Sequence, residues 1–249
     1  MIKKLILLTV CAALFWLCSC SENSENINNK QEITDGDFEE MKILTYSLGM
    51  NYTNCYLVYG ETSKKACLID APEYDDEIMD AILSKDLELE YIILTHGHFD
   101  HILGAEEFKK KTGAKIAVHE LETEYLEDPD KSMTFLYNSE IISADAEFKD
   151  GDVLSFGGIS LKVFHTPGHT KGSSFFVCDT EKIMFSGDTL FKNNIGRFDF
   201  YGGDYDILIA SLQKLKSAFA GESDYIIYPG HGDATTLRDE IAENYYFRQ

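Results

Sequence analysis

The chain has 249 residues, of which 44% are hydrophobic and 26% are charged, as in an ordinary soluble globular protein. Its formal net charge of -21 argues against nucleic acid as a partner and against adsorption to anionic lipid. The length suits one large domain or two small ones, and nothing in the composition sets the oligomeric state.

The first twenty residues have a different composition from the rest. Lys3 and Lys4 precede an apolar run from Leu5 to Leu17, which suits the core of a signal peptide and is short for a membrane span. The run ends in LCSC, which resembles a bacterial lipobox. We therefore expect a signal peptide over residues 1–19 and a lipid on Cys20. Ordinary secretion or a short uncleaved anchor is the alternative.

Residues 20–40 contain the polar stretch SENSENINNK and are expected to form a flexible tether. With a lipid on Cys20, the protein would be exported and anchored to the bacterial cell envelope, and the membrane would be its partner through that anchor. The globular domain is expected over residues 41–249. Its cysteines, Cys55, Cys67 and Cys178, lie in apolar runs, which favours buried thiols over disulfides or a metal site.

The first half of the domain alternates strand and helix patterns. Apolar runs predict strands at residues 55–60, 66–72, 91–96 and 115–120. Apolar residues at helical spacing predict a helix over residues 74–85, and a second helix is expected from Ile102 to Lys111, stopped near Gly113. This alternation indicates an α/β domain with layered sheets.

The second half begins with residues 128–150, which contain Pro129 and an aromatic cluster without a clear period and are expected to form a loop over a site. Two hairpins are predicted, one over residues 152–166 and one over 173–188. An amphipathic helix from Leu208 to Phe219, a strand over 224–230 and a helix from Thr236 to Glu243 follow.

The stretch THGHFDH holds three of the seven histidines directly after a strand-like run. His96 and His98 lie two residues apart, so their imidazoles can point the same way. Asp100 and His101 come after a short bend and can turn toward a second point close by. Imidazole nitrogen and carboxylate oxygen suit zinc, manganese or iron(II). Since one catalytic metal needs three protein ligands, four in one segment favour two adjacent metals.

A second metal requires ligands from elsewhere in the chain. Three further candidates each follow a strand-like run and lie among glycines, namely His169 in HTPGHT, Asp188 in FSGDT and His231 in YPGHGD. Asp188 suits a bridging position because a carboxylate can bind one ion with each oxygen.

These motifs, THGHFDH, TPGHT, SGDTLF and PGHG, resemble in order and spacing the metallo-β-lactamase-fold hydrolases. The resemblance implies a four-layer αββα sandwich with two divalent ions between the sheet edges, zinc first and iron or manganese as alternatives. It implies that His96, His98 and His169 hold one ion, that Asp100, His101 and His231 hold the other, and that Asp188 bridges them.

Two roles within this resemblance are supporting ones. Asp70 would hold a ligand imidazole by its free N–H, although a turn or cap role is a close alternative. His119 and His165 fall on no ligand position and are interpreted as core or surface residues, with a supporting role possible for His165.

The reaction implied is hydrolysis by metal-activated water, with Asp100 and His101 at the catalytic centre. The run from Gly187 onward resembles short, glyoxalase II-like hydrolases, which favours a small thioester or ester as substrate. Zinc β-lactamases of the commonest type have a cysteine where Asp188 stands, so that activity fits poorly.

Substrate binding is assigned to Arg197, at a basic position that glyoxalase II uses near a carboxylate of its substrate. Asp199 and Asp233 stand where that family has aromatic residues, which puts glutathione specificity in doubt. The alternative is a structural Arg197 paired with Asp199 or Asp204.

The sequence is compatible with two other functions. One is a mononuclear iron persulfide dioxygenase on the same fold, which would use His96, His169 and Asp188 alone. The other is a non-catalytic binding lipoprotein, whose signature would be lost ligands, whereas all seven are present.

Overall fold

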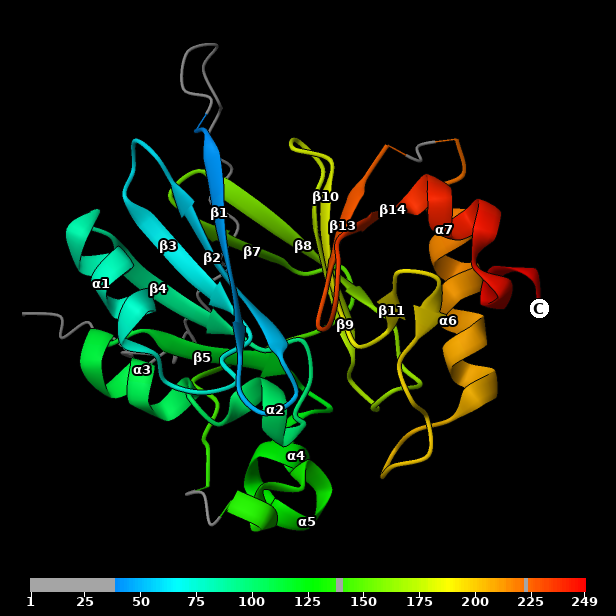
Figure 1. Ribbon diagram of the computed structural model, residues 1–249, viewed down its shortest axis with the longest axis horizontal. Coiled ribbons are helices and arrows are strands. Elements are labelled where there is room, and N and C mark those ends of the chain that lie inside the picture. The colour runs from blue at the N-terminus through cyan, green and yellow to red at the C-terminus, as the bar shows by residue number, and fades with distance from the viewer. Residues whose placement is uncertain (1–38, 138–140, 222–223) are drawn as a thin grey trace, which may run out of the picture. The chain divides into compact units, whose positions relative to one another are not determined.

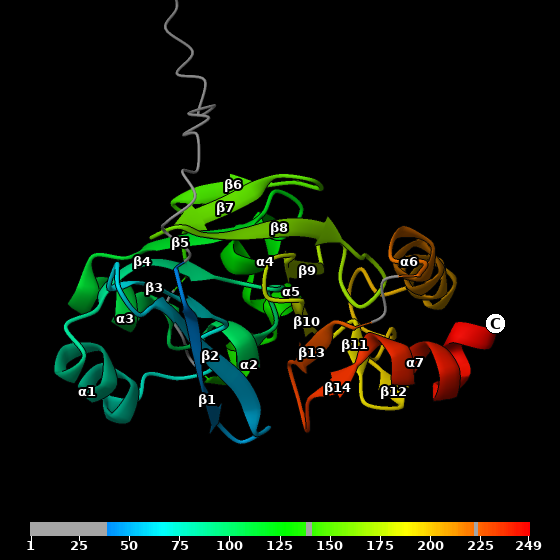
Figure 2. The same cartoon turned by 90° about the horizontal axis from the view of Figure 1, so that it is seen from above.

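The computed structural model describes residues 39–137, 141–221 and 224–249. The expected signal peptide, Cys20 and nearly all of the expected tether lie outside these residues. Within the described part, α1 and α3 lie on one side, α6 and α7 on the other, and two sheets lie between them (Figures 1 and 2). This is the expected αββα sandwich, and the α/β fold class is confirmed.

The first sheet has the strand order β1-β2-β3-β4-β5-β6. β1, β2 and β3 pair antiparallel, and β3 through β6 pair parallel. Its strands are β1 (Met41–Leu48), β2 (Thr53–Gly60), β3 (Lys65–Ile69), β4 (Glu88–Ile93), β5 (Lys115–His119) and β6 (Ala146–Phe148). The helices of this half are α1 (Asp76–Ser84), α2 (Phe99–Ile102), α3 (Ala105–Thr112), α4 (Thr123–Glu127), α5 (Pro129–Ser132) and the 3-10 helix η1 (Thr134–Tyr137).

The second sheet has the order β14-β13-β10-β9-β8-β7, in which only β10 and β13 pair parallel. Its strands are β7 (Val153–Phe156), β8 (Ile159–His165), β9 (Ser174–Cys178), β10 (Ile183–Gly187), β13 (Ile226–Pro229) and β14 (Thr235–Thr236). A small ribbon, β11 (Leu190–Phe191) with β12 (Asn194–Ile195), follows β10. The remaining helices are α6 (Tyr205–Ala218), α7 (Leu237–Glu243) and the 3-10 helix η2 (Tyr245–Arg248).

Three hydrophobic clusters fill the three interfaces between the four layers. Strand β2 shows how the sequence divides between them, because successive side chains of a strand point to opposite faces. Cys55 and Leu57 pack with the α1/α3 layer, whereas Tyr56 and Val58 pack between the sheets. A strand buried on both faces reads as a continuous apolar run, which is why CYLVYG shows no polar alternation.

Two expected elements differ from the structure. The helix expected from Ile102 begins instead at Ala105, because Gly104 separates it from the four-residue helix α2. Its end is confirmed, since Gly113 adopts the left-handed conformation (φ 78°) that ends helices. The loop expected over residues 128–150 is wrong for α5, η1 and β6, which are ordered elements there.

The three domain cysteines are buried free thiols, as expected. Within the part of the chain that the structure describes, no helix has the length and hydrophobicity to cross a membrane.

Candidate metal centre

The seven candidate ligands come from five places in the chain and meet where strands of both sheets end. His96 and His98 follow β4, and Asp100 and His101 lie on α2. The other three lie in the loops after β8, β10 and β13, namely His169, Asp188 and His231. Three overlapping groups, each with ligand atoms within 4.8 Å of one another, are His96/His98/His169, His96/His101/Asp188 and Asp100/His101/His231.

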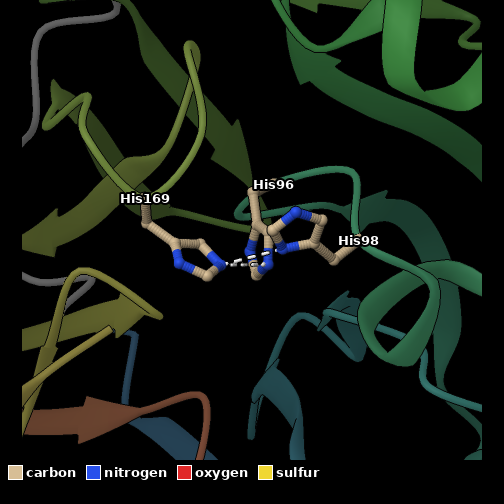
Figure 3. A group of neighbouring side chains, drawn as sticks. All are labelled: His96, His98 and His169. Carbon is tan, nitrogen blue, oxygen red and sulfur yellow. Dashed lines mark hydrogen bonds between the residues drawn. The ribbon is translucent and has the colours of Figure 1, made fainter. Parts of the chain in front are cut away.

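The first group consists of three buried imidazoles that face one another (Figure 3). The Nε2 atom of His169 lies 2.9 Å from Nδ1 of His98 and 3.1 Å from Nε2 of His96. The rings of His96 and His98 are nearly perpendicular, at 89°. Three nitrogens therefore converge on one point from three directions, as a metal site requires.

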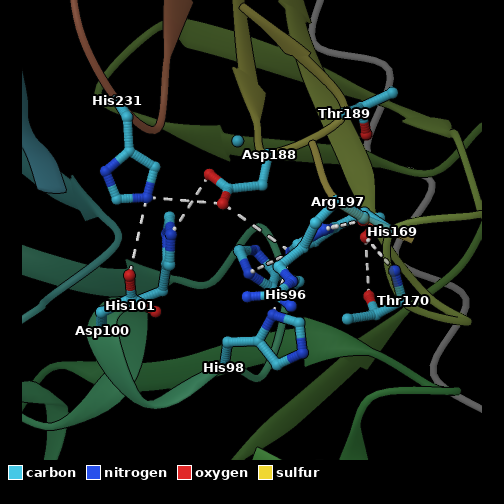
Figure 4. A network of polar contacts seen from close by, with 12 residues as sticks. His96, His98, Asp100, His101, His169, Thr170, Asp188, Thr189, Arg197 and His231 are labelled. Atoms are coloured by element: carbon cyan, nitrogen blue, oxygen red, sulfur yellow. Dashed lines mark hydrogen bonds and ion pairs between the residues drawn. The ribbon is translucent and has the colours of Figure 1, made fainter. Parts of the chain in front are cut away.

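The second group shares His96 with the first and His101 with the third, and Asp188 lies between the histidines of all three (Figure 4). Asp188 Oδ1 lies 3.3 Å from Nε2 of His101, and its Oδ2 lies 3.4 Å from Nε2 of His231 and 3.7 Å from Nε2 of His169. Oδ2 of Asp100 lies 3.5 Å from the same His231 nitrogen. The two oxygens of Asp188 thus face ligands of both groups, which is the arrangement expected of a bridging carboxylate.

The outward nitrogens of three imidazoles fix which ring atom keeps a lone pair. Nδ1 of His169 donates to the Arg197 carbonyl (2.7 Å), and Nδ1 of His231 donates to the Asn51 carbonyl (3.2 Å). Nδ1 of His101 donates to Asp70 Oδ2 (2.7 Å). Because each Nδ1 carries the hydrogen, each Nε2 presents its lone pair to the centre.

His96 is oriented by a short relay through Thr95. The Thr95 hydroxyl donates to Asp70 Oδ2 (2.8 Å), so it accepts the N–H of His96 Nδ1 at 3.0 Å. Nε2 of His96 then faces Nε2 of His169 with no hydrogen between them. Two lone pairs at this distance repel one another unless a cation lies between them.

The residues fit a divalent metal on a second observation as well. In the described part of the chain, the buried side-chain nitrogens and oxygens without a hydrogen-bond partner are His98 Nε2, His101 Nε2 and Asp188 Oδ1. All three belong to candidate ligands, although buried polar atoms are ordinarily paired, but His98 faces the other imidazoles with Nδ1 and not with its unpaired Nε2. For His101 and Asp188, the unpaired atoms point at each other across 3.3 Å, where an ion would satisfy both.

The charges of the cluster also suit cation binding. Burial lowers the pKa of His96, His98 and His169, and neighbouring imidazoles lower those of His96 and His98 further. Burial opposes the charged forms of His101 and Asp188 too, but each stabilises the other, so the pKa of His101 is raised and that of Asp188 is lowered. The first group therefore offers neutral imidazoles and Asp188 an ionised carboxylate, the states that bind metal ions.

The structure places the other predicted site residues as follows. Asp70, at the end of β3, contacts both His101 and Thr95, as described above. Arg197 pairs in a bidentate manner with Asp199 (2.7 and 2.8 Å), and its guanidinium carbon lies 3.4 Å from the centre of the Phe200 ring. This is the pairing with Asp199 that was expected if Arg197 has a structural role instead of binding substrate.

His119 and His165 lie outside the ligand cluster, as the resemblance implied. Their rings stack on each other with centroids 4.2 Å apart. His119 is buried, and Nε2 of His165 donates to the Lys171 carbonyl at 2.8 Å.

Three residues near the centre were not predicted from the sequence. Asn51 donates from its side chain to Asp100 Oδ2 (2.8 Å), Thr95 orients His96, and Glu122 contacts two of the ligand loops. The sequence carried a signal for Thr95 and Glu122, since Thr95 directly precedes His96 and Glu122 follows a predicted strand. Asn51 carried no signal, because it reaches Asp100 across 49 positions.

The sequence model that describes the metallo-β-lactamase superfamily matches residues 48–231, and the chain belongs to this superfamily. A similar protein is the hydroxyacylglutathione hydrolase GloC of Haemophilus influenzae, which is 34% identical over 77% of this chain and 91% of its own length.

Two solved structures are also similar. The BLEG-1 B3 metallo-β-lactamase is 30% identical, with a TM-score of 0.76 over 84% of this chain and all of the other. TTHA1623, in a di-iron-bound form, is 29% identical, with a TM-score of 0.70 over 82% of this chain and 99% of the other.

Proposed function

We propose that this metallohydrolase is dinuclear and acts on a small thioester or ester, in the glyoxalase II-like branch. The observation that carries the proposal is the position of Asp188, whose two oxygens face His169 of the first expected site and His101 and His231 of the second. Two ions bound there would supply a nucleophilic hydroxide at neutral pH and polarise the attacked carbonyl. The candidate metals are zinc, iron and manganese.

The candidate ligands would form two neighbouring metal sites. His96, His98 and His169 would hold the first ion, and Asp100, His101 and His231 the second, with Asp188 between them. Their outward hydrogen bonds keep the Nε2 lone pairs of four imidazoles directed inward, so little reorganisation is needed when ions bind.

Thioester chemistry is supported by the relatives and by the leaving group. GloC of Haemophilus influenzae and a protein of Rhodopseudomonas palustris, 33% identical over 71% of this chain, are both named hydroxyacylglutathione hydrolases. A thiol has a pKa of about 8.5, so a thiolate can leave with little help from a protonating residue. No separate nucleophilic serine or cysteine is then needed.

The competing hypothesis is that the protein is a mononuclear iron dioxygenase. It would need only His96, His169 and Asp188. The convergence of Asp100, His101 and His231 on a neighbouring point favours two ions instead. Oxygen uptake with a persulfide substrate by protein containing one iron per chain would support the competing hypothesis.

We propose further that Arg197 binds a carboxylate of the substrate. Its backbone carbonyl already holds His169, so the residue lies next to the centre. Its side chain is half exposed and paired with an exposed Asp199, and such surface pairs contribute little to stability. A substrate carboxylate could therefore replace Asp199 through the same paired hydrogen bonds.

The test is a panel of thioesters, esters and a β-lactam, each as an anionic and a neutral analogue. Arg197→Ala should raise KM for the anionic thioester about tenfold and leave the neutral one nearly unchanged. Asp199→Asn is the matched control, because it frees the guanidinium and should lower KM for the anionic substrate. Equal effects on charged and neutral substrates would assign Arg197 a structural role. Hydrolysis of the β-lactam alone would overturn the thioester assignment.

A lipid anchor on Cys20 is proposed from the sequence LCSC and the polar stretch behind it. Cys20→Ala should release the protein from membranes into the soluble fraction. Retention after a high-salt wash would mean that the anchor lies elsewhere.

A further inference from the structure

Glu122 is a fully buried carboxylate that lies between two of the ligand loops. Its exposed fraction is 0%. Its Oε2 accepts the backbone N–H of Gly97 at 2.7 Å, and its Oε1 accepts the backbone N–H of Gly172 at 2.6 Å. Gly97 lies between His96 and His98, and Gly172 lies three residues after His169. One side chain therefore joins the two loops that carry all three candidate ligands of the first ion.

The backbone of both loops lies unusually close to this carboxylate and its helix. A Cβ atom on Gly97 would lie 2.5 Å from Cβ of Tyr125, and one on Gly172 would lie 2.7 Å from Cγ of Glu122. Contacts of this length do not occur between real side chains, so only glycine allows the approach. The two glycines and Glu122 thus form one tightly fitted unit.

A local structural role does not account for Glu122. It stands at the N-cap position of α4, where a carboxylate could accept from its own helix, yet its side chain makes no capping hydrogen bond. Among the described residues, no lysine or arginine forms an ion pair with it. Burial raises the pKa of Glu122 to about 7, although bonds from Thr170, Gly172 and Gly97 act in the opposite direction. A buried carboxylate without a cation is costly, and capping of α4 does not offset that cost.

We propose that Glu122 is a positioning residue for the first ion, and that its two oxygens set the separation between the His96/His98 loop and the His169 loop. This inference rests on the proposed metal site. A carboxylate is needed because both contacts are backbone N–H donors. An amide offers one acceptor oxygen and would turn its own NH₂ group toward the second donor.

The experiment isolates the first site in an Asp100→Ala background, which removes a ligand of the second site only. The affinity for Zn²⁺ is then measured by competition with a chromophoric chelator, and the ligand field is followed by the visible spectrum of the Co²⁺-loaded protein. Glu122→Gln should weaken Zn²⁺ binding 10- to 100-fold, as loss of a residue that orients ligands typically does. The Co²⁺ spectrum should change with it.

Glu240→Gln is the matched control. Glu240 is also a buried carboxylate that accepts a backbone N–H, from Asn193, but it contacts none of the seven candidate ligands. The same substitution there should lower stability and leave Zn²⁺ affinity within about twofold of the background.

Gly172→Ala is a second variant, in case Glu122→Gln fails to fold. It keeps the carboxylate and pushes the loop away from it, so it should also weaken Zn²⁺ binding at least tenfold. Affinities for Glu122→Gln or Gly172→Ala equal to that of Glu240→Gln would overturn the inference. Absence of Zn²⁺ binding by the unsubstituted chain would instead overturn the proposed function, so the two failures are distinguishable.

Discussion

At the scale of single residues, Asp70 supports two candidate ligands without belonging to the ligand set itself. It accepts from the backbone N–H of Thr95 (2.7 Å), from the Thr95 hydroxyl and from His101 Nδ1. It does so with a left-handed backbone (φ 58°), which aspartate and asparagine adopt more readily than other side chains. The sequence predicted its position at the end of a strand and a contact with a ligand imidazole, but not which imidazole nor the two contacts with Thr95.

Asp70→Asn should keep the backbone conformation and the volume while turning an NH₂ group toward a donor. We expect metal affinity or kcat/KM to fall 10- to 100-fold with little change in the circular dichroism spectrum. A change within twofold in both quantities would mean that Asp70 serves only the turn.

His119 gives the protein a pH-dependent stability that is separate from the metal centre. Burial, helped by neighbouring His165, lowers the pKa of His119 to about 4. Between about pH 6.5 and pH 4 the unfolded chain binds a proton that the folded chain does not bind. Stability is therefore lost as the pH falls through this window.

His119→Phe should remove this contribution. The difference in the free energy of unfolding between pH 7 and pH 5 should shrink by on the order of 2 kcal/mol, measured by urea denaturation of metal-free protein. Loss of the bond from Leu121 N–H to the ring affects both pH values equally. An unchanged difference would show that His119 is protonated in the folded state.

At the scale of elements, the sequence predicted those strands and helices whose pattern is long. The helix α2 has four residues, which is too short for a period to appear, and yet it carries Asp100 and His101. In the segment expected to be a loop, Pro129 occupies the first turn of α5, and Asp128 caps that helix by accepting from Asp130 N–H. Proline is common in the first turn of a helix, so the residue that suggested a loop instead marks the start of α5.

The start of β2 and the end of β13 hold the two sheets together beside the centre. Asn54 donates from its backbone to the Gly230 carbonyl (2.7 Å) and from its side chain to the carbonyls of Pro229 and Gly232 (both 2.9 Å). These contacts surround His231, which itself bridges to Thr53.

Asn54→Ala should therefore affect both stability and metal binding. It removes the donor of the Gly232 carbonyl and one of the two donors of the Pro229 carbonyl, which keeps the Tyr56 hydroxyl, and we expect a loss of about 1–3 kcal/mol in the free energy of unfolding. Affinity at the second site should fall, because His231 is no longer held in place, while the first site is affected less. Equal weakening at both sites would show that the effect is general destabilisation.

At the scale of the whole molecule, the centre exists only because both sheets meet at one edge. The sequence could supply the seven candidate ligands, because histidine and aspartate are distinctive and their motifs follow strands. It could not supply the backbone partners at Gly97, Gly172, Asn51 and Arg197, since every residue has a carbonyl and nearly every residue an N–H. Which backbone groups face the centre depends on the fold.

The central claim is that these residues hold two divalent ions, and metal stoichiometry tests it most directly. Purified protein is loaded with Zn²⁺, freed of excess ion, and analysed for metal per chain, alongside Asp100→Ala. We predict two ions per chain for the natural sequence and one for the variant. One ion in both proteins, even when binding is measured in excess metal, would contradict the account.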